Sequence, residues 1–146
     1  MRFDRRNPLE VRGADLDSTM SKVIRQARIT RAQVREERST IFVFGDNLLG
    51  KGYGGQAGAM RGEPNAVGIP TKYAPDLRES SFFSDADFDR LRPILDQSFA
   101  KLKALKKYHN IVIPADGLGT GLAQLGRRAP RILAYINQKI EELGRT

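Results

Sequence analysis

The stretch IFVFGDNLLGKGYGGQAGAM, from Ile41 to Met60, decides the fold of this chain. It begins with an apolar run, continues through a loop with glycines at positions 50, 52, 54 and 55, and ends in small residues typical of a helix start. A strand, a glycine-rich loop and a helix in this order let backbone N–H groups reach a phosphate, because glycine lacks a Cβ and permits close approach. The stretch therefore predicts an anion-binding loop.

A second stretch of the same kind, IVIPADGLGTGL, runs from Ile111 to Leu122. It again places glycines soon after a short apolar strand. Because the carboxyl ends of parallel strands meet at one edge of a sheet, we expect both loops to lie at the same edge. The two stretches together predict one ligand that is held from two sides.

The composition of the 146-residue chain is ordinary for one globular domain, with 40% apolar and 29% charged residues. The net charge of +8 is spread along the chain and favours anionic partners. No apolar run approaches the roughly 20 residues of a membrane span, and the start lacks the apolar segment of a secretory signal, so we expect a cytoplasmic protein without membrane contact. The absence of cysteine excludes thiolate chemistry. A histidine-rich metal site is excluded because the chain has a single histidine, His109. We expect no metal and no cofactor.

Short apolar strands alternate with amphipathic helices along the chain. The strands are expected within 21–29, 40–44, 66–69 and 111–113, and the helices after an N-cap at Thr30, over 54–61, from a Ser84–Asp87 capping box past Leu105 with an interruption at Pro93, and over 127–143. This alternation predicts an α/β fold, namely a three-layer α/β/α sandwich with a mixed, mostly parallel sheet. We expect a single domain over residues 21–146, preceded by an N-terminal arm of residues 1–20.

Both glycine stretches resemble segments of the macrodomains, the ADP-ribose-binding α/β modules. The first, extended to MRG, resembles the macrodomain strand, loop and helix, with Asn47 at the position of the ribose-contacting asparagine. The second, extended through AQLGRRAPRILAYI, resembles the second phosphate loop and the C-terminal helix. The first stretch together with GIPTK also resembles small bacterial and phage proteins of unassigned function with a macro-like core. The resemblance implies a macrodomain-like sandwich and ADP-ribose or a related nucleotide as the ligand.

The resemblance also bears on catalysis. Lys72 in GIPTK matches a lysine that macrodomains similar to the terminal ADP-ribose glycohydrolase use together with an aspartate of the second loop. In this chain Ala123 takes the place of that aspartate, and Asp116 is a candidate replacement. Gln56 lies near the acidic position of other hydrolytic macrodomains, and Arg28 replaces the adenine-contacting aspartate. These departures predict weak or no glycohydrolase activity.

The candidate site residues follow from the two loops. Those for ligand binding are Gly45, Asp46, Asn47, Gly52, Tyr53, Gly54, Gly55, Gln56, Gly117, Gly119, Thr120, Gly121 and Leu122, and those for catalysis are Lys72 and Asp116. Asp46 either closes an Asx-turn or holds a ribose hydroxyl. Lys72 is either a nucleophile with a lowered pKa or, as we prefer, a permanent cation that faces a phosphate.

Three functions follow from these residues. The first is a binding module for ADP-ribose or a related NAD-derived nucleotide. The alternative is a hydrolase of ADP-ribosyl bonds that uses Lys72 with Asp46 or Asp116, since a hydrolase needs an acid or base within reach. The third, which we do not favour, is a nucleic-acid-binding protein, because the basic residues form no stripe with interleaved aromatic residues.

Overall fold

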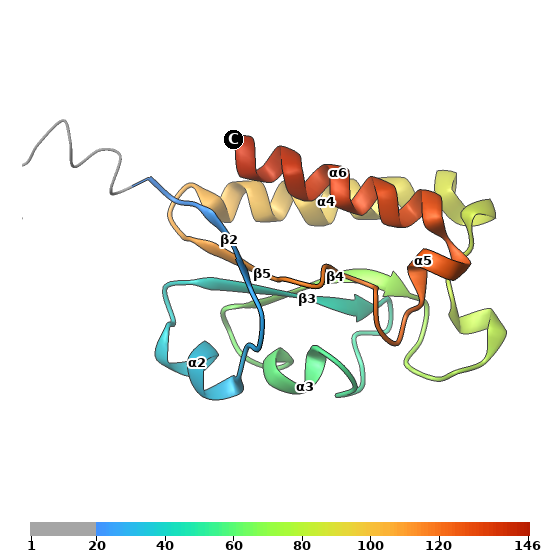
Figure 1. The fold of residues 1–146 in the computed structure, drawn as a ribbon, viewed down its shortest axis with the longest axis horizontal. Coiled ribbons are helices and arrows are strands. Elements are labelled where there is room, and N and C mark those ends of the chain that lie inside the picture. Colours follow the sequence, from blue (N-terminus) through green and yellow to red (C-terminus); the bar gives the residue numbers. More distant parts are fainter. Residues whose placement is uncertain (1–19) are drawn as a thin grey trace, which may run out of the picture.

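The computed structural model describes residues 20–146, so the predicted N-terminal arm of residues 1–20 lies, apart from Met20, outside the described residues. Four strands form one sheet in the order β2-β5-β3-β4 (Figure 1). Their bounds are β2 Val23–Gln26, β3 Ile41–Asn47, β4 Ala66–Lys72 and β5 Ile111–Pro114. The three strands that precede or follow the glycine stretches, β5, β3 and β4, are therefore neighbours.

All pairs in this sheet are parallel, so the expectation of a mixed sheet was wrong for the described residues. Each strand is followed by a helix or a long loop before the next one begins, and only such crossovers can join parallel neighbours. Antiparallel pairing within residues 20–146 is limited to an isolated bridge between Lys72 and Phe82.

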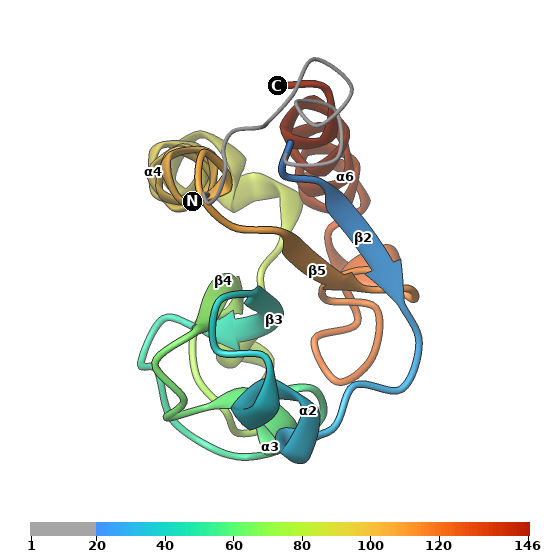
Figure 2. The same ribbon diagram turned by 90° about the vertical axis from the view of Figure 1, so that its left-hand side faces the viewer.

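Helices cover both faces of the sheet, which makes three layers (Figures 1 and 2). The short helices α2 and α3 lie on one face, and the long helices α4 and α6 lie on the other. The bounds are α2 Arg31–Glu36, α3 Ala57–Met60, α4 Phe88–Lys106, α5 Leu125–Arg128 and α6 Pro130–Arg145, with 3₁₀ turns η1 Glu79–Ser81 and η2 Asp85–Asp87. No helix within residues 20–146 is long and apolar enough to cross a bilayer. The expected α/β layering is thus confirmed.

The central strand β3 is apolar throughout its first half because it is buried on both faces. Phe42 and Phe44 pack with Met60 of α3 in the smaller core cluster. Val43 belongs to the larger cluster, which contains residues of α4 and α6 such as Leu95. A parallel strand that is covered by helices on both sides reads as a continuous hydrophobic run, and IFVF is such a run.

Several local predictions about helix ends can be compared with the structure. Thr30 caps α2, because its Oγ1 accepts a hydrogen bond from Gln33 N at 3.1 Å. The predicted interruption at Pro93 was wrong, since α4 is continuous through it. A proline near the start of a helix removes one hydrogen bond, and burial of Leu91 and Leu95 on either side of Pro93 keeps the turns together.

Two other helices differ from their predicted bounds. The helix expected over 54–61 is reduced to α3, because Gly55 adopts a left-handed backbone with φ +56°. The helix expected over 127–143 is divided into α5 and α6, and Pro130 is the first residue of α6. The fixed φ of proline suits a helix start and its missing N–H costs nothing there.

Glu63 lies just before β4 and joins this strand through three arginines to α2 and the turn that follows it. Its Oε2 lies 2.6 Å from Arg31 Nη1 and 2.9 Å from Arg35 Nε, and its Oε1 lies 2.9 Å from Arg38 Nη1. The hydrogen bond from Arg31, followed by that from Arg38, lowers the pKa of Glu63 from 4.5 to about 2. The carboxylate is therefore ionised whenever the protein is folded at ordinary pH.

We expect Glu63→Gln to lower the unfolding temperature at pH 7. A depressed carboxyl pKa stabilises the fold above the unfolded-state value of 4.5, and this contribution disappears as pH falls towards 2. The difference between variant and wild type should therefore shrink below about pH 4.5. Thermal melts between pH 7 and pH 3 measure it, with Glu141→Gln as a control, because Glu141 is exposed and contacts Arg145 at 3.7 Å. A difference that does not depend on pH would contradict this account of the cluster.

Candidate functional site

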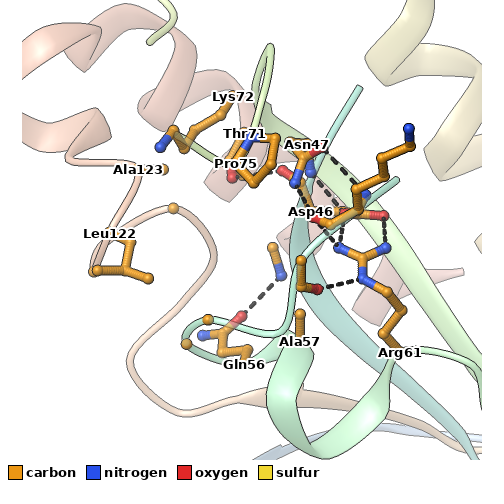
Figure 3. A pocket seen from close by; sticks show the side chains of 17 residues that line it. Asp46, Asn47, Gln56, Ala57, Arg61, Thr71, Lys72, Pro75, Leu122 and Ala123 are labelled. Carbon is orange, nitrogen blue, oxygen red and sulfur yellow. Dashed lines mark hydrogen bonds and ion pairs between the residues drawn. The ribbon is translucent and has the colours of Figure 1, made fainter. Parts of the chain in front are cut away.

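The two glycine loops meet at the carboxyl edge of the sheet, as the sequence predicts. The first loop follows β3 and the second follows β5, and these strands are neighbours. A cavity of about 140 Å³ lies between the loops (Figure 3). It is lined by Gly45, Asp46, Asn47, Lys51, Gly52, Gly54, Gly55, Gln56, Ala57, Arg61, Thr71, Lys72, Pro75, Gly119, Gly121, Leu122 and Ala123. Most of the predicted site residues are therefore brought together.

Four of the predicted residues do not line this cavity. The side chain of Tyr53 points into solvent, with Tyr53 68% exposed. Thr120 Oγ1 donates a hydrogen bond to the carbonyl of Asp116 at 3.0 Å within the second loop. Gly117, in the same loop, is buried. Asp116 lines a neighbouring hollow instead, and so lies away from the wall that carries Lys72.

The neighbouring hollow has a volume of about 200 Å³ and lies where β2 and β5 end. Its walls include Arg28, Met60 and Asp116, and it shares Gly55 and Gln56 with the cavity. Two adjoining spaces at one sheet edge suit a ligand with two ends.

Gln56 separates the two spaces and joins the two loops. Its Oε1 accepts a hydrogen bond from Gly45 N at 2.8 Å, and its Nε2 donates one to Gly117 O at 2.9 Å. Both polar atoms of the side chain are thus used within the protein. Gln56, which the sequence suggests as a ligand contact, links the end of β3 to the second loop through these two hydrogen bonds.

Asn47 likewise uses its side chain inside the first loop. Its Nδ2 donates to Lys51 O at 2.8 Å, and its Oδ1 accepts from Leu49 N at 3.2 Å and from Lys51 N at 3.4 Å. This is the turn-closing geometry that asparagine favours. Asp46, the preceding residue, forms an ion pair with Arg61, in which Oδ1 lies 2.5 Å from Nη2. Neither side chain is left free in the cavity.

Lys72 ends β4 in the cavity wall and is only 6% exposed. Its Nζ donates a hydrogen bond to Asp76 O at 2.7 Å and lies 4.3 Å from the ring centroid of Phe82. Burial lowers the pKa of Lys72 from its ordinary value, and the positive charge of Arg128 lowers it further, against an opposing effect of Asp76. The amine is therefore a desolvated, partly satisfied cation.

Backbone N–H groups on both loops are available to a ligand. Those of residues 52–57 and 118–123 make no hydrogen bond within the part of the chain that the structure describes. Gly119 is itself buried and lines the cavity. Buried N–H groups without a partner are rare in proteins, so this donor calls for water or a ligand atom. The cavity is a place where an acceptor-rich, anionic group can be bound.

The charges around the cavity agree with this. Lys51, Arg61 and Lys72 are cationic lining residues, whereas Asp46 is the one carboxylate among them. Within residues 20–146, no cluster of three or more histidine, cysteine or acidic residues could hold a metal ion. The site therefore offers amides and cations as its chemistry.

Six residues that line the cavity were not among the candidate site residues named from the sequence, namely Lys51, Ala57, Arg61, Thr71, Pro75 and Ala123. Thr71 is buried and donates from Oγ1 to Asp46 O at 3.0 Å. Its position beside Lys72, at the end of a strand, was a usable signal. Pro75 reaches the cavity from the loop after β4, and no pattern in the sequence indicates that contact.

These features define an α/β domain whose two glycine-rich loops surround one cavity at the edge of a parallel sheet. The chain belongs to the Family of unknown function (DUF7831), whose model matches residues 24–139. That range includes all four described strands, except the first residue of β2, and both loops. Neither a curated protein nor a solved structure matches the chain.

We expect Gly119→Ala to lower the free energy of unfolding by about 1–3 kcal/mol. A Cβ at this position would lie 2.3 Å from Leu125 Cδ1, in the core, and the backbone has a φ of +77°. Gly121→Ala is the matched control, because nothing lies within 4 Å of its Cβ position and its φ is not in the left-handed range. Urea denaturation compares the two variants, and equal midpoints would show that the close packing of Gly119 is not needed.

Proposed function

We propose that the protein binds ADP-ribose or a related NAD-derived nucleotide, with the diphosphate between the two glycine loops. The observation that carries this proposal is the two sets of unpartnered N–H groups, in residues 52–57 and 118–123, on the loops that surround one cavity. Successive backbone amides in a glycine-rich loop bind phosphate oxygens without needing a side chain. Two such loops suit two linked phosphates.

Charge supports the same class of ligand. Cationic residues outnumber the carboxylate around the cavity, and the net charge of the chain is +8. A positive field favours phosphorylated ligands and increases their rate of association. The choice of ADP-ribose among such ligands comes from the resemblance of both loops to those of a macrodomain. The neighbouring hollow, which shares Gly55 and Gln56 with the cavity, offers room for a second end of the ligand.

Hydrolysis of an ADP-ribosyl bond is a second candidate, because the pKa of Lys72 is lowered by burial and a neutral amine is a nucleophile. Its suggested partners are placed unfavourably. Asp46 is paired with Arg61, and Asp116 lines the other hollow. Ala123, at the position of the aspartate in the macrodomains that the chain resembles, lines the cavity together with Lys72. We therefore favour binding, with weak or no turnover.

Calorimetric titration with ADP-ribose, AMP, NAD and pyrophosphate tests the proposal, with a short oligonucleotide as the nucleic-acid comparison. We expect ADP-ribose to bind and Gly121→Val to weaken it at least tenfold, which is about 1.4 kcal/mol. Gly121 lines the cavity and a Cβ there meets no atom within 4 Å, so a branched side chain adds volume at the cavity wall without a clash at its Cβ. Gly126→Ala, in α5 and outside the cavity lining, is the control. Unchanged affinity in Gly121→Val, with a native circular dichroism spectrum, would remove the second loop from the site.

Lys72 distinguishes the two candidate functions. If it acts as a cation, Lys72→Ala should weaken ADP-ribose binding about tenfold and Lys72→Arg should weaken it less. If it acts as a nucleophile, both variants should lose turnover, and borohydride should trap a covalent adduct on the wild-type lysine. We expect partial retention in the arginine variant and no adduct. A trapped adduct would establish the hydrolase instead.

A further inference from the structure

Arg61 follows α3 directly and sends its side chain back along the first glycine loop (Figure 3). Its Nε donates to Gly52 O at 2.6 Å, and its Nη2 donates to Lys51 O at 3.2 Å. The same guanidinium group bonds both carboxylate oxygens of Asp46, from Nη2 at 2.5 Å and from Nη1 at 3.3 Å. Its central carbon lies 5.4 Å from the ring centroid of Phe44. One side chain thus links the loop to the end of β3.

These contacts leave little of the guanidinium group for a ligand. Arginine has five N–H donors, and the four hydrogen bonds above use four of them. The side chain is also only 14% exposed, and the Asp46 side chain is 16% exposed. Arg61 lines the cavity, but its charge is already matched by a carboxylate. A direct ion pair between Arg61 and a phosphate is therefore not what this geometry favours.

The first part of the loop is also closed by Asn47, but the part after Lys51 has few other restraints. Gly50, Gly52 and Gly55 all adopt positive φ, a conformation that glycine enters freely but at an entropic cost. Among the described residues, the backbone N–H groups of residues 52–57 bond to nothing, so the path of the loop is not fixed by its own backbone. Arg61 holds the carbonyl group of Gly52 and shares that of Lys51 with Asn47 Nδ2. Because the loop is held by its carbonyl groups, its backbone N–H groups remain without a partner among the described residues.

We propose that Arg61 is the positioning residue of the first glycine loop. It holds the carbonyl groups of Lys51 and Gly52 to the protein and thereby leaves the amides of the loop free for the ligand, while Asp46 orients its guanidinium group. Asp46 acts on the ligand through Arg61 and the loop. This inference rests on the proposed function, because it assigns a role in binding of the same anionic ligand.

Substitutions that separate charge from geometry test the proposal. Arg61→Lys keeps the positive charge and loses the planar fork, and Asp46→Ala removes a negative charge beside the cavity and frees the guanidinium group. If Arg61 contacted the anion directly, Arg61→Lys would bind nearly as well as wild type and Asp46→Ala would bind more tightly. If Arg61 positions the loop, both variants bind ADP-ribose at least tenfold more weakly.

Titration with ADP-ribose and with pyrophosphate at 25 °C supplies this comparison. We also expect the double variant Asp46→Ala/Arg61→Ala to bind no more weakly than Arg61→Ala, because the two residues act as one unit. Arg35→Lys is the matched control, since Arg35 lies on α2, outside the cavity lining. Thermal melts establish that each variant is folded. Tighter binding by Asp46→Ala, or wild-type affinity in Arg61→Lys, would overturn the proposal.

A measurement without ligand separates this inference from the proposed function. Lys51 is exposed, and its carbonyl group is one that Arg61 holds, so trypsin should cut the Lys51–Gly52 bond slowly in wild type. In Arg61→Lys the loop opens more often, and we expect that cleavage to be roughly tenfold faster, relative to cleavage after Lys107 at the far end of α4. Unchanged cleavage would refute the role of Arg61. Failure of wild type to bind either ligand would refute the proposed function, and the cleavage rate would still decide the role of Arg61.

Discussion

The site depends on the close approach of two backbone segments, at Gly45 and Gly119. A Cβ on Gly45 would lie 3.3 Å from Gly119 N, and a Cβ on Gly119 would lie 3.1 Å from Thr71 Cγ2. The ends of β3 and β4 and the loop after β5 therefore pack closely against one another. Because all four strands are parallel, each of them delivers its carboxyl end to this edge, which is where open α/β sheets bind ligands.

Such an edge leaves backbone polar groups without partners. The residues on either side of α3 form hydrogen bonds with some of them. Gln56 precedes the helix and ties the first loop to the second, whereas Arg61 follows it and ties the first loop to β3. Met60, in the same helix, is buried under the sheet with Phe42. A helix of four residues is too short to be stable alone, so α3 depends on this packing and on the contacts of its two flanking side chains. Gln56 accepts from the amide of Gly45 alone, and Arg61 donates to oxygens only, so the amides of residues 52–57 remain without a partner among the described residues.

The backbone of this arrangement could be predicted from the sequence, and much of its side-chain chemistry could not. The IFVF run, the glycines after it and IVIP with its glycines indicated two strands with loops at one edge, because periodicity and glycine content are local signals. Gln56 and Asn47 were expected to face a ligand, yet both satisfy backbone groups of the loops. A polar side chain next to a loop can do either, and the choice depends on which backbone atoms the fold brings within reach. The position of Asp116 could not be predicted for the same reason, because the hollow that it lines is formed by the end of β2 and the residues after it as well as by its own loop.

The reactions that the cavity could support depend on which carboxylates lie near Lys72 and whether they are already paired. Asp46 is bound by Arg61 through both oxygens in charge-assisted hydrogen bonds, so its carboxylate is already engaged within the protein. Lys72 has its amine on the carbonyl group of Asp76 and over the ring of Phe82, with no carboxylate oxygen within ion-pair distance in the described part of the chain. An amine whose pKa is lowered by burial could attack an electrophile, but a hydrolysis also needs a group that activates water and protonates the leaving oxygen. Among the described residues, the cavity provides amides that can hold charge and no unpaired carboxylate beside Lys72, which supports the proposal of ligand binding.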